Sequence, residues 1–156
     1  MPKAIAIEEK QDTERQQYVV FDLGNEEYGL EIELAKEILK PTKITPVPNT
    51  KDYVPGVINL RGQIIPVVDL FKRFSLVGAE NREKEKIIIV EIQDTMIGLM
   101  VDRVQEIVWI DEETLDDPPE VAGGIKQEFL KGVGTLRDEL LIIIDINETL
   151  FEVENN

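Results

Sequence analysis

Two arginines hold matching places in two similar stretches of this 156-residue chain. The first stretch is "VINLRGQIIPVVDL", residues 57–70, and the second is "VGTLRDELLIIIDI", residues 133–146. The planar guanidinium of arginine can hold both oxygens of a carboxylate, so Arg61 and Arg137 could each form an internal salt bridge or contact a partner. Gly62 lets another backbone approach Arg61 closely, which makes Arg61 the stronger candidate for a partner contact.

Each stretch also carries an aspartate near its end. Asp69 precedes "LFKRF", and Asp145 precedes "INETL". Because aspartate accepts hydrogen bonds from backbone N–H groups where a helix begins, both are predicted to cap short helices. This interpretation is favoured over a catalytic or metal-binding role.

The composition removes most catalytic chemistry. The chain has no histidine and no cysteine, which excludes disulfides, thiolate catalysis, histidine general-base catalysis and most zinc sites. The acidic residues 111–120 lack the spacing of a calcium loop, and no phosphate-binding loop or nucleophile elbow is present. We therefore expect no enzyme activity, no metal and no cofactor.

The charge balance also bears on the partners. Seventeen basic and 32 acidic residues give a net charge of −15, which repels nucleic-acid phosphates and anionic lipids. No apolar run has the length of a membrane span or the form of a secretory signal. We expect a cytoplasmic protein without membrane insertion, with a mobile N-terminal tail at residues 1–17 and a C-terminal tail at 151–156.

The apolar pattern is that of strands. "YVVFDL" (18–23) and "YGLEI" (28–32) are predicted to form a hairpin around "GNEE". "GVINLR" and "QIIPVVDL" predict a second hairpin, and Pro66 indicates that its second strand has an exposed edge or a bulge. After a charged linker at residues 75–86, "IIIVEI", "MIGLMVD", "VQEIVWI", "FLKGVGTLR" and "LLIIIDI" continue the strand pattern.

The two halves of the chain match each other. Tyr18 to Leu39 aligns with Ile87 to Val108 at an offset of 69, and Val54 to Phe71 aligns with Leu130 to Asn147 at an offset of 76. This match predicts an internal duplication of one all-β unit. It also aligns "LAKEILK" with the β-branched "RVQEIVW", so residues 33–40 are expected to be largely extended, with room for one helical turn at Leu34–Lys36.

Each copy supplies about five short strands, which suits a small barrel. A unit of roughly 55–65 residues has a marginal core alone, so the copies should share one. The sequence therefore predicts an all-β fold of two five-stranded barrels, at residues 18–74 and 87–150, with a shared hydrophobic core and short helices.

Several motifs together resemble the bacterial chemotaxis coupling proteins of the CheW family. They are "YVVFDLGNEEYGLEI", "KEIL", "VPGVINLRGQIIPVVDL", "IGLMVD" and "VQEIV", and the resemblance covers residues 18–150. It implies two SH3-like barrels in an adaptor that joins the cytoplasmic tips of methyl-accepting chemoreceptors to the regulatory domain of the histidine kinase CheA. Such a scaffold is recruited to membrane receptor arrays through these partners, and a fused receiver domain is not expected because the chain ends soon after "NETLFEV".

The resemblance also implies the residues at or near receptor and kinase contacts: Ala35, Glu37, Gly56, Arg61, Gly62, Val104 and Ile107. Of these, Val104 and Ile107 are expected to line a groove between the barrels. Ile87 and Ile88 are assigned to the kinase interface, while Arg137 lies outside the family signature. From the residues alone, Glu37 and Glu106 could each lie on a solvated face or make a selective contact.

Two other interpretations remain at this point. The chain could be the CheW-like regulatory domain of the kinase itself, although the polar residues between Met1 and Tyr18 favour a separate protein. A nucleic-acid-binding barrel is disfavoured by the net charge of −15, and retention on heparin at moderate salt would revive it.

Overall fold

The structure is a computed structural model that describes residues 15–76 and 86–150. Its strands are β1 (Arg15–Leu23), β2 (Glu26–Glu31), β3 (Ala35–Leu39), β4 (Gly56–Leu60), β5 (Gln63–Asp69), β6 (Lys86–Ile92), β7 (Thr95–Val101), β8 (Arg103–Asp111), β9 (Val121–Ala122), β10 (Ile125–Lys126), β11 (Leu130–Leu136) and β12 (Glu139–Ile144). Its helices are the short α2 (Leu70–Arg73) and α3 (Ile146–Thr149) and the 3-10 turns η1 (Ile32–Leu34), η2 (Glu112–Thr114) and η3 (Gln127–Phe129).

The predicted tails and linker fall mostly outside the described residues. Residues 1–14, 77–85 and 151–156 are not described. The prediction of a tail through residue 17 is wrong at its end, because Arg15–Gln17 already belong to β1 and pair with β8.

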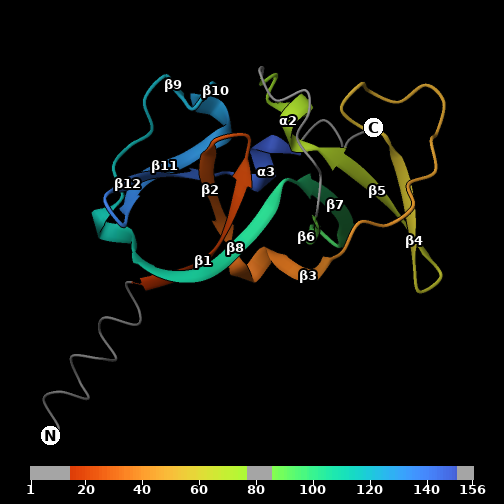
Figure 1. Ribbon diagram of the computed structural model, residues 1–156, viewed down its shortest axis with the longest axis horizontal. Coiled ribbons are helices and arrows are strands. Elements are labelled where there is room, and N and C mark those ends of the chain that lie inside the picture. Colours follow the sequence, from red (N-terminus) through yellow and green to blue (C-terminus); the bar gives the residue numbers. More distant parts are fainter. Residues whose placement is uncertain (1–14, 77–85, 151–156) are drawn as a thin grey trace, which may run out of the picture.

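Ten of the strands form two sheets of five (Figure 1). One has the order β11-β12-β2-β1-β8 and the other β3-β6-β7-β5-β4, while β9 and β10 make a separate small hairpin. The predicted all-β class and the two five-stranded units are confirmed. Closure of either sheet into a complete barrel stays a prediction, because each order has two ends.

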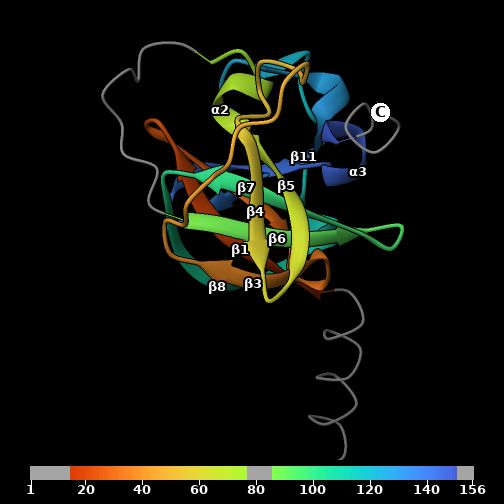
Figure 2. The ribbon, with the colours of Figure 1, turned by 90° about the vertical axis from the view of Figure 1, so that its right-hand side faces the viewer.

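The sheets do not follow the two copies of the repeat. By the offsets of 69 and 76, β1 to β5 correspond to β6, β7, β8, β11 and β12. Each sheet takes its first hairpin from one copy and its other three strands from the other copy (Figure 2). The expectation that residues 18–74 and 87–150 each build their own sheet is therefore wrong.

Parallel pairing explains this exchange of hairpins. The last strand of each copy pairs with the second strand of the other, through Ile142↔Tyr28 in one sheet and Val67↔Gly98 in the other. Local sequence signals predict each hairpin. They do not predict which hairpin completes a given sheet, because the two copies have similar apolar strands. The choice between them is made by tertiary packing.

The core confirms that the two units share their apolar interior. Adjacent residues of β1 divide between two clusters: Val19 packs in the large cluster between the sheets, and Val20 packs in a small cluster inside its own sheet. Ile88 and Ile89 of β6 divide in the same way. Alternation along each strand thus places one face in a private core and the other in the shared core.

The local predictions are largely confirmed. Asp69 accepts hydrogen bonds from the backbone of α2, and Asp145 accepts one from the backbone of α3. Residues 35–39 are a strand, preceded by the single turn η1, which begins two residues earlier than expected. Pro66 pairs with β4 alone, since the ladder to β7 begins at Val67, so this part of β5 does have an unpaired side.

Candidate protein-interaction site

Arg61 occupies the turn between β4 and β5. Arg61 has φ 51° and Gly62 has φ 85°, the left-handed pair that a tight two-residue hairpin requires. The Asn59 side-chain oxygen accepts a hydrogen bond from the Gly62 N–H at 2.9 Å and holds the turn. The turn allows the Arg61 side chain to reach Glu37 on β3.

Both oxygens of Glu37 are bound by Arg61. Arg61 Nη2 donates to Oε1 at 2.6 Å, and Nη1 donates to Oε2 at 3.2 Å. The hydrogen bonds and charge of Arg61 lower the pKa of Glu37 below its ordinary value, and Glu37 raises the pKa of Arg61. Both groups stay open to solvent, so the ion pair remains accessible to another molecule.

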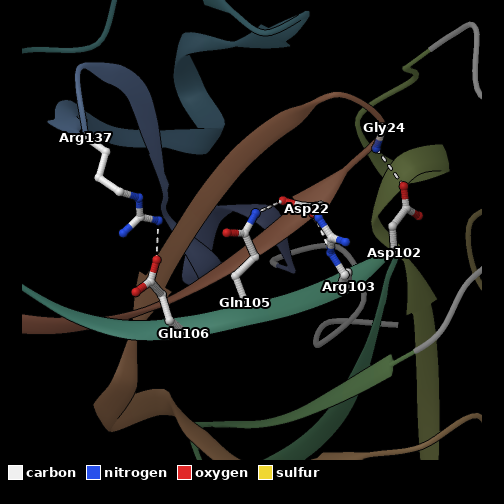
Figure 3. Close-up of polar contacts among 7 residues, drawn as sticks. All are labelled: Asp22, Gly24, Asp102, Arg103, Gln105, Glu106 and Arg137. Atoms are coloured by element: carbon white, nitrogen blue, oxygen red, sulfur yellow. Dashed lines mark hydrogen bonds and ion pairs between the residues drawn. The ribbon is translucent and has the colours of Figure 1, made fainter.

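The second copy of the repeat makes the same contact. Arg137 and Asp138 form the turn between β11 and β12 with φ 51° and 65°, and Arg137 Nη2 donates to Glu106 on β8 (Figure 3). An internal salt bridge, the alternative that the sequence left open, is thus confirmed for both arginines. The weaker sequence candidate, Arg137, thus occupies the equivalent turn and contacts the equivalent glutamate, through Nη2 and one carboxylate oxygen.

Each ion pair spans the two ends of one sheet. Arg61 projects from the β4–β5 turn, and β4 and Glu37's strand β3 are the two end strands of the same sheet. In the loop that follows β3, Thr45 also exchanges hydrogen bonds of 2.8 and 2.9 Å with Val57 of β4. In the other sheet Asp116 and Val133 make the equivalent bridge.

Gly56 lies at this bridge, and its role in a partner contact stays a prediction. A Cβ at this position would lie 2.1 Å from the carbonyl oxygen of Thr45, which is far inside van der Waals contact. The residue is buried. Gly62, in contrast, has open space around it and remains available at the surface.

η1 and the beginning of β3 lie beside β8 (Figures 1 and 2). These elements carry several apolar residues that are partly buried or exposed. The partly buried members pack against the shared core: Ile32, Leu34, Ala35 and Val104. Ile38 and Ile107 occupy equivalent positions in the repeat, and their side chains are 43% and 50% exposed. We call these six residues the apolar strip; it includes the predicted contact residues Ala35, Val104 and Ile107.

The assignment of Ile87 and Ile88 to a kinase interface meets a physical obstacle. Their side chains are 3% and 0% exposed, since β6 lies inside its sheet with one face toward each core. Neither side chain is available to a partner at the surface of this structure. The run "IIIV" is continuously apolar because both faces of this central strand are buried.

A polar cluster that the sequence did not indicate lies on β1 and β8. Asp22 accepts hydrogen bonds from Arg103 Nε at 3.1 Å and from Gln105 at 2.6 Å (Figure 3). Beside it, Asp102 accepts one from the Gly24 N–H at 2.7 Å, which ties the β1–β2 turn to the start of β8. The repeat offered a signal for this cluster. At the offset of 69 the equivalents of Asp22 and Gln105 are Glu91 and Lys36, two residues of opposite charge. They form an ion pair at 3.8 Å.

Comparison with known proteins agrees with this geometry. A family model described as a CheW-like domain matches residues 17–154. The chain belongs to the CheW-like family. Its members include the chemotaxis protein CheW of Klebsiella aerogenes, which is 35% identical over 143 residues, covering 92% of this chain and 86% of that protein.

Further CheW proteins extend the comparison. The CheW of Treponema pallidum is 35% identical over 139 residues, covering 86% of this chain and 82% of that protein. The crystal structure of the scaffolding protein TtCheW from Thermoanaerobacter tengcongensis is similar to this fold, with 42% identity, 84% of each chain covered and a TM-score of 0.78. The CheW family is thus shown by sequence and by fold, and it is a family of chemotaxis scaffolds.

A cavity of about 420 Å³ lies away from the residues that the family motifs indicate. Its lining includes Arg73, whose guanidinium lies between the rings of Tyr53 and Phe129, with centroids at 4.9 and 4.6 Å. Arg73 Nε also donates to the carbonyl oxygen of Thr149 at 2.8 Å. Tyr53 and Arg73 belong to the first copy of the repeat. At the offset of 76 their equivalents in the second copy are Phe129 and Thr149. The contacts of Arg73 therefore join the two copies.

Two negative findings apply to residues 15–76 and 86–150. Among them, no helix has both the length and the apolar character needed to cross a membrane. No group of three or more carboxylate, histidine or cysteine side chains there could hold a metal ion.

Proposed function

We propose that this protein is a non-catalytic chemotaxis adaptor that couples methyl-accepting chemoreceptors to the histidine kinase CheA. The observation that carries the proposal is the exposed, two-bonded Arg61–Glu37 pair in the family motifs "VINLRG" and "KEIL". An internal partner holds the guanidinium in one orientation, which reduces the entropy lost when another molecule binds. The proposal includes recruitment to membrane receptor arrays from the cytoplasmic side.

The apolar strip, apart from Ile38, supplies a surface for a helical receptor tip. An amphipathic helix packs its apolar face on such residues, and Ala35, Val104 and Ile107 provide a partly buried base with an exposed margin. Glu37 follows Ala35 by two positions on β3. In this arrangement the ion pair contacts polar groups of the receptor beside the apolar contact and selects its register.

We assign the kinase contact to an exposed residue on β3 that pairs with the buried Ile88. Ile38 pairs with Ile88 across the β3–β6 ladder and is 43% exposed. We therefore expect Ile38, rather than Ile87 or Ile88, to meet the regulatory domain of CheA. Ile88 would support Ile38 from the shared core.

The test is an amide-shift titration of the isotope-labelled full chain with two unlabelled partners in turn: the CheA regulatory domain and a receptor hairpin-tip fragment. We expect two saturable footprints, with Glu37 and Arg61 in at least one. Absence of shifts with both partners would contradict the adaptor function.

A matched pair of variants assigns the footprint. Arg61→Glu should lose receptor-dependent kinase activation while it remains folded, because it places a carboxylate against Glu37 and removes the guanidinium. Arg137→Glu makes the same change at the equivalent turn of the other copy and should retain more coupling. Normal coupling by Arg61→Glu would show that the site is assigned wrongly.

A further inference from the structure

The cavity of about 420 Å³ lies where the two halves of the chain meet. Its volume is within the range of pockets that take small molecules. One wall comes from α2 of the first half, and the others come from β10, η3 and α3 of the second half, in the upper half of Figures 1 and 2. We call it the junction cavity; the wall residues that matter here are Arg73, Phe74, Lys126, Glu128, Phe129 and Glu148.

The Arg73 guanidinium is fixed in the wall of the junction cavity. The ring centroids of Tyr53 and Phe129 lie 4.9 and 4.6 Å from it. Its Nε donates to the carbonyl oxygen of Thr149 at 2.8 Å. Because rings occupy the faces of the guanidinium, the donors on Nη1 and Nη2 meet an acceptor only in its plane. A carboxylate suits these donors, since it accepts two parallel hydrogen bonds.

The junction cavity carries charges of both signs. Lys126 adds a second cation, and Glu128 and Glu148 add two anions, all at exposed residues. In the part of the chain that the structure describes, no ion pair joins Arg73 or Lys126 to either glutamate. The glutamates and the net charge of −15 repel a polyanion, and the two cations repel a simple amine. A ligand with one carboxylate and one ammonium group complements both pairs.

Two phenylalanines supply the apolar part of the wall. Phe74 is buried, and its ring centroid lies 5.7 Å from that of the partly buried Phe129. Pockets for small molecules combine apolar walls with a few placed polar groups. An apolar substituent on the ligand therefore gains from leaving water at these rings while the charged groups of the ligand remain at the charged side chains.

We propose that the junction cavity binds a small zwitterion of the class of the apolar α-amino acids. The ligand carboxylate binds Arg73 and Lys126. The ligand ammonium group binds Glu128 and Glu148, and the apolar side chain of the ligand packs on the phenylalanine rings. This site goes beyond the adaptor function and does not depend on it.

The first test is an amide-shift titration of the isotope-labelled full chain with L-leucine. Two matched probes each lack one charge: 4-methylpentanoate has no ammonium group, and 3-methylbutylamine has no carboxylate. We expect saturable shifts at Gly124, Lys126 and Glu148 with L-leucine, and binding that is about ten-fold weaker with each of the other probes. Absence of saturable shifts up to the solubility of L-leucine, or equal binding of all three probes, would overturn the proposal.

Exposed charges permit matched variants. Lys126→Gln and Glu148→Gln each remove one charge from the wall and should weaken L-leucine binding about ten-fold. Lys40→Gln and Glu113→Gln remove the same charges from exposed residues outside the junction cavity and should bind as the unmodified chain does. Circular dichroism should be equal in all five proteins. Unchanged affinity in the two wall variants would show that L-leucine binds elsewhere.

Thermal unfolding gives an independent readout. A ligand that binds the folded chain alone raises the unfolding midpoint in proportion to its occupancy. Saturating L-leucine should therefore raise the midpoint of the unmodified chain and of both control variants. At the same concentration the double variant Lys126→Gln/Glu148→Gln should show a smaller rise, and an equal rise in all of these proteins would contradict the assigned site.

Discussion

Arg61 Nη2 lies 2.6 Å from Glu37 Oε1 although 24 positions separate the two residues and their strands stand at opposite ends of the sheet order. The contact recurs between Arg137 and Glu106 in the other sheet. Unpaired end strands expose N–H and C=O groups that can pair with other chains. In each sheet one ion pair connects the hairpin turn beside one end strand to the other end strand, and the Arg61–Glu37 pair is exposed where the family motif lies.

Exchange of the two charges separates a structural role from a contact role. Glu37→Arg/Arg61→Glu should restore the ion pair and the unfolding midpoint lost in Arg61→Glu, because the same groups face each other in reversed order. Receptor binding should stay lost, since the guanidinium then projects from β3. The measurements are thermal unfolding and receptor titration of both variants. Recovery of receptor binding in the exchanged variant would show that the ion pair has only a structural role.

The pKa of Glu37 should depend on Arg61. Arg61 lowers it from an ordinary value of 4.5, so the pair stabilises the fold above that pH, and the contribution is lost as the pH falls through the lowered pKa. In Arg61→Ala the pKa of Glu37 should rise toward 4.5, and the stability difference from the unmodified chain should vanish in acid. Carboxyl-carbon NMR titration measures the pKa, and Arg137→Ala should leave it unchanged.

Neighbouring isoleucines of β5 should differ sharply in their effect on stability. Ile65 is 0% exposed and packs in a private core, while Ile64 is 60% exposed. Ile65→Ala should lower the free energy of unfolding by about 2–5 kcal/mol through the cavity it leaves. Ile64→Ala should change it by less than about 0.5 kcal/mol; similar urea midpoints for the two variants would contradict the alternation of β5.

Two glycines of the family motif should differ for a steric reason. In Gly56→Ala the new methyl group would meet the Thr45 carbonyl, so the bridge to Val57 must open, at a cost of about 1–3 kcal/mol for an overpacked site. Gly62→Ala meets open space and should cost only about 1 kcal/mol for its left-handed backbone. Urea unfolding measures both changes, and loss of amide protection at Thr45 and Val57 should accompany the first alone.

Much of the local structure was predictable from the sequence because its causes lie within a few residues. Asp69 caps a helix through the N–H groups two and three positions ahead. Arg61 and Gly62 form a turn whose dihedral angles depend on those two residues. Alternating apolar residues predicted hairpins, and the repeat predicted that residues 35–39 are extended despite their helical composition.

Tertiary structure alone decided which strands share a sheet and what the turn arginines contact. The repeat offers each hairpin two equivalent partners, and only packing of the shared core selects the strands of the other copy. That exchange places β6 in the middle of its sheet, which buries Ile87 and Ile88 against both cores. It also makes β3 and β4 the opposite ends of one curved sheet, and this curvature brings Arg61 to Glu37. The sequence does not predict the contact between Arg61 and Glu37, because this contact depends on the path of every strand that lies between β3 and β4 in the sheet.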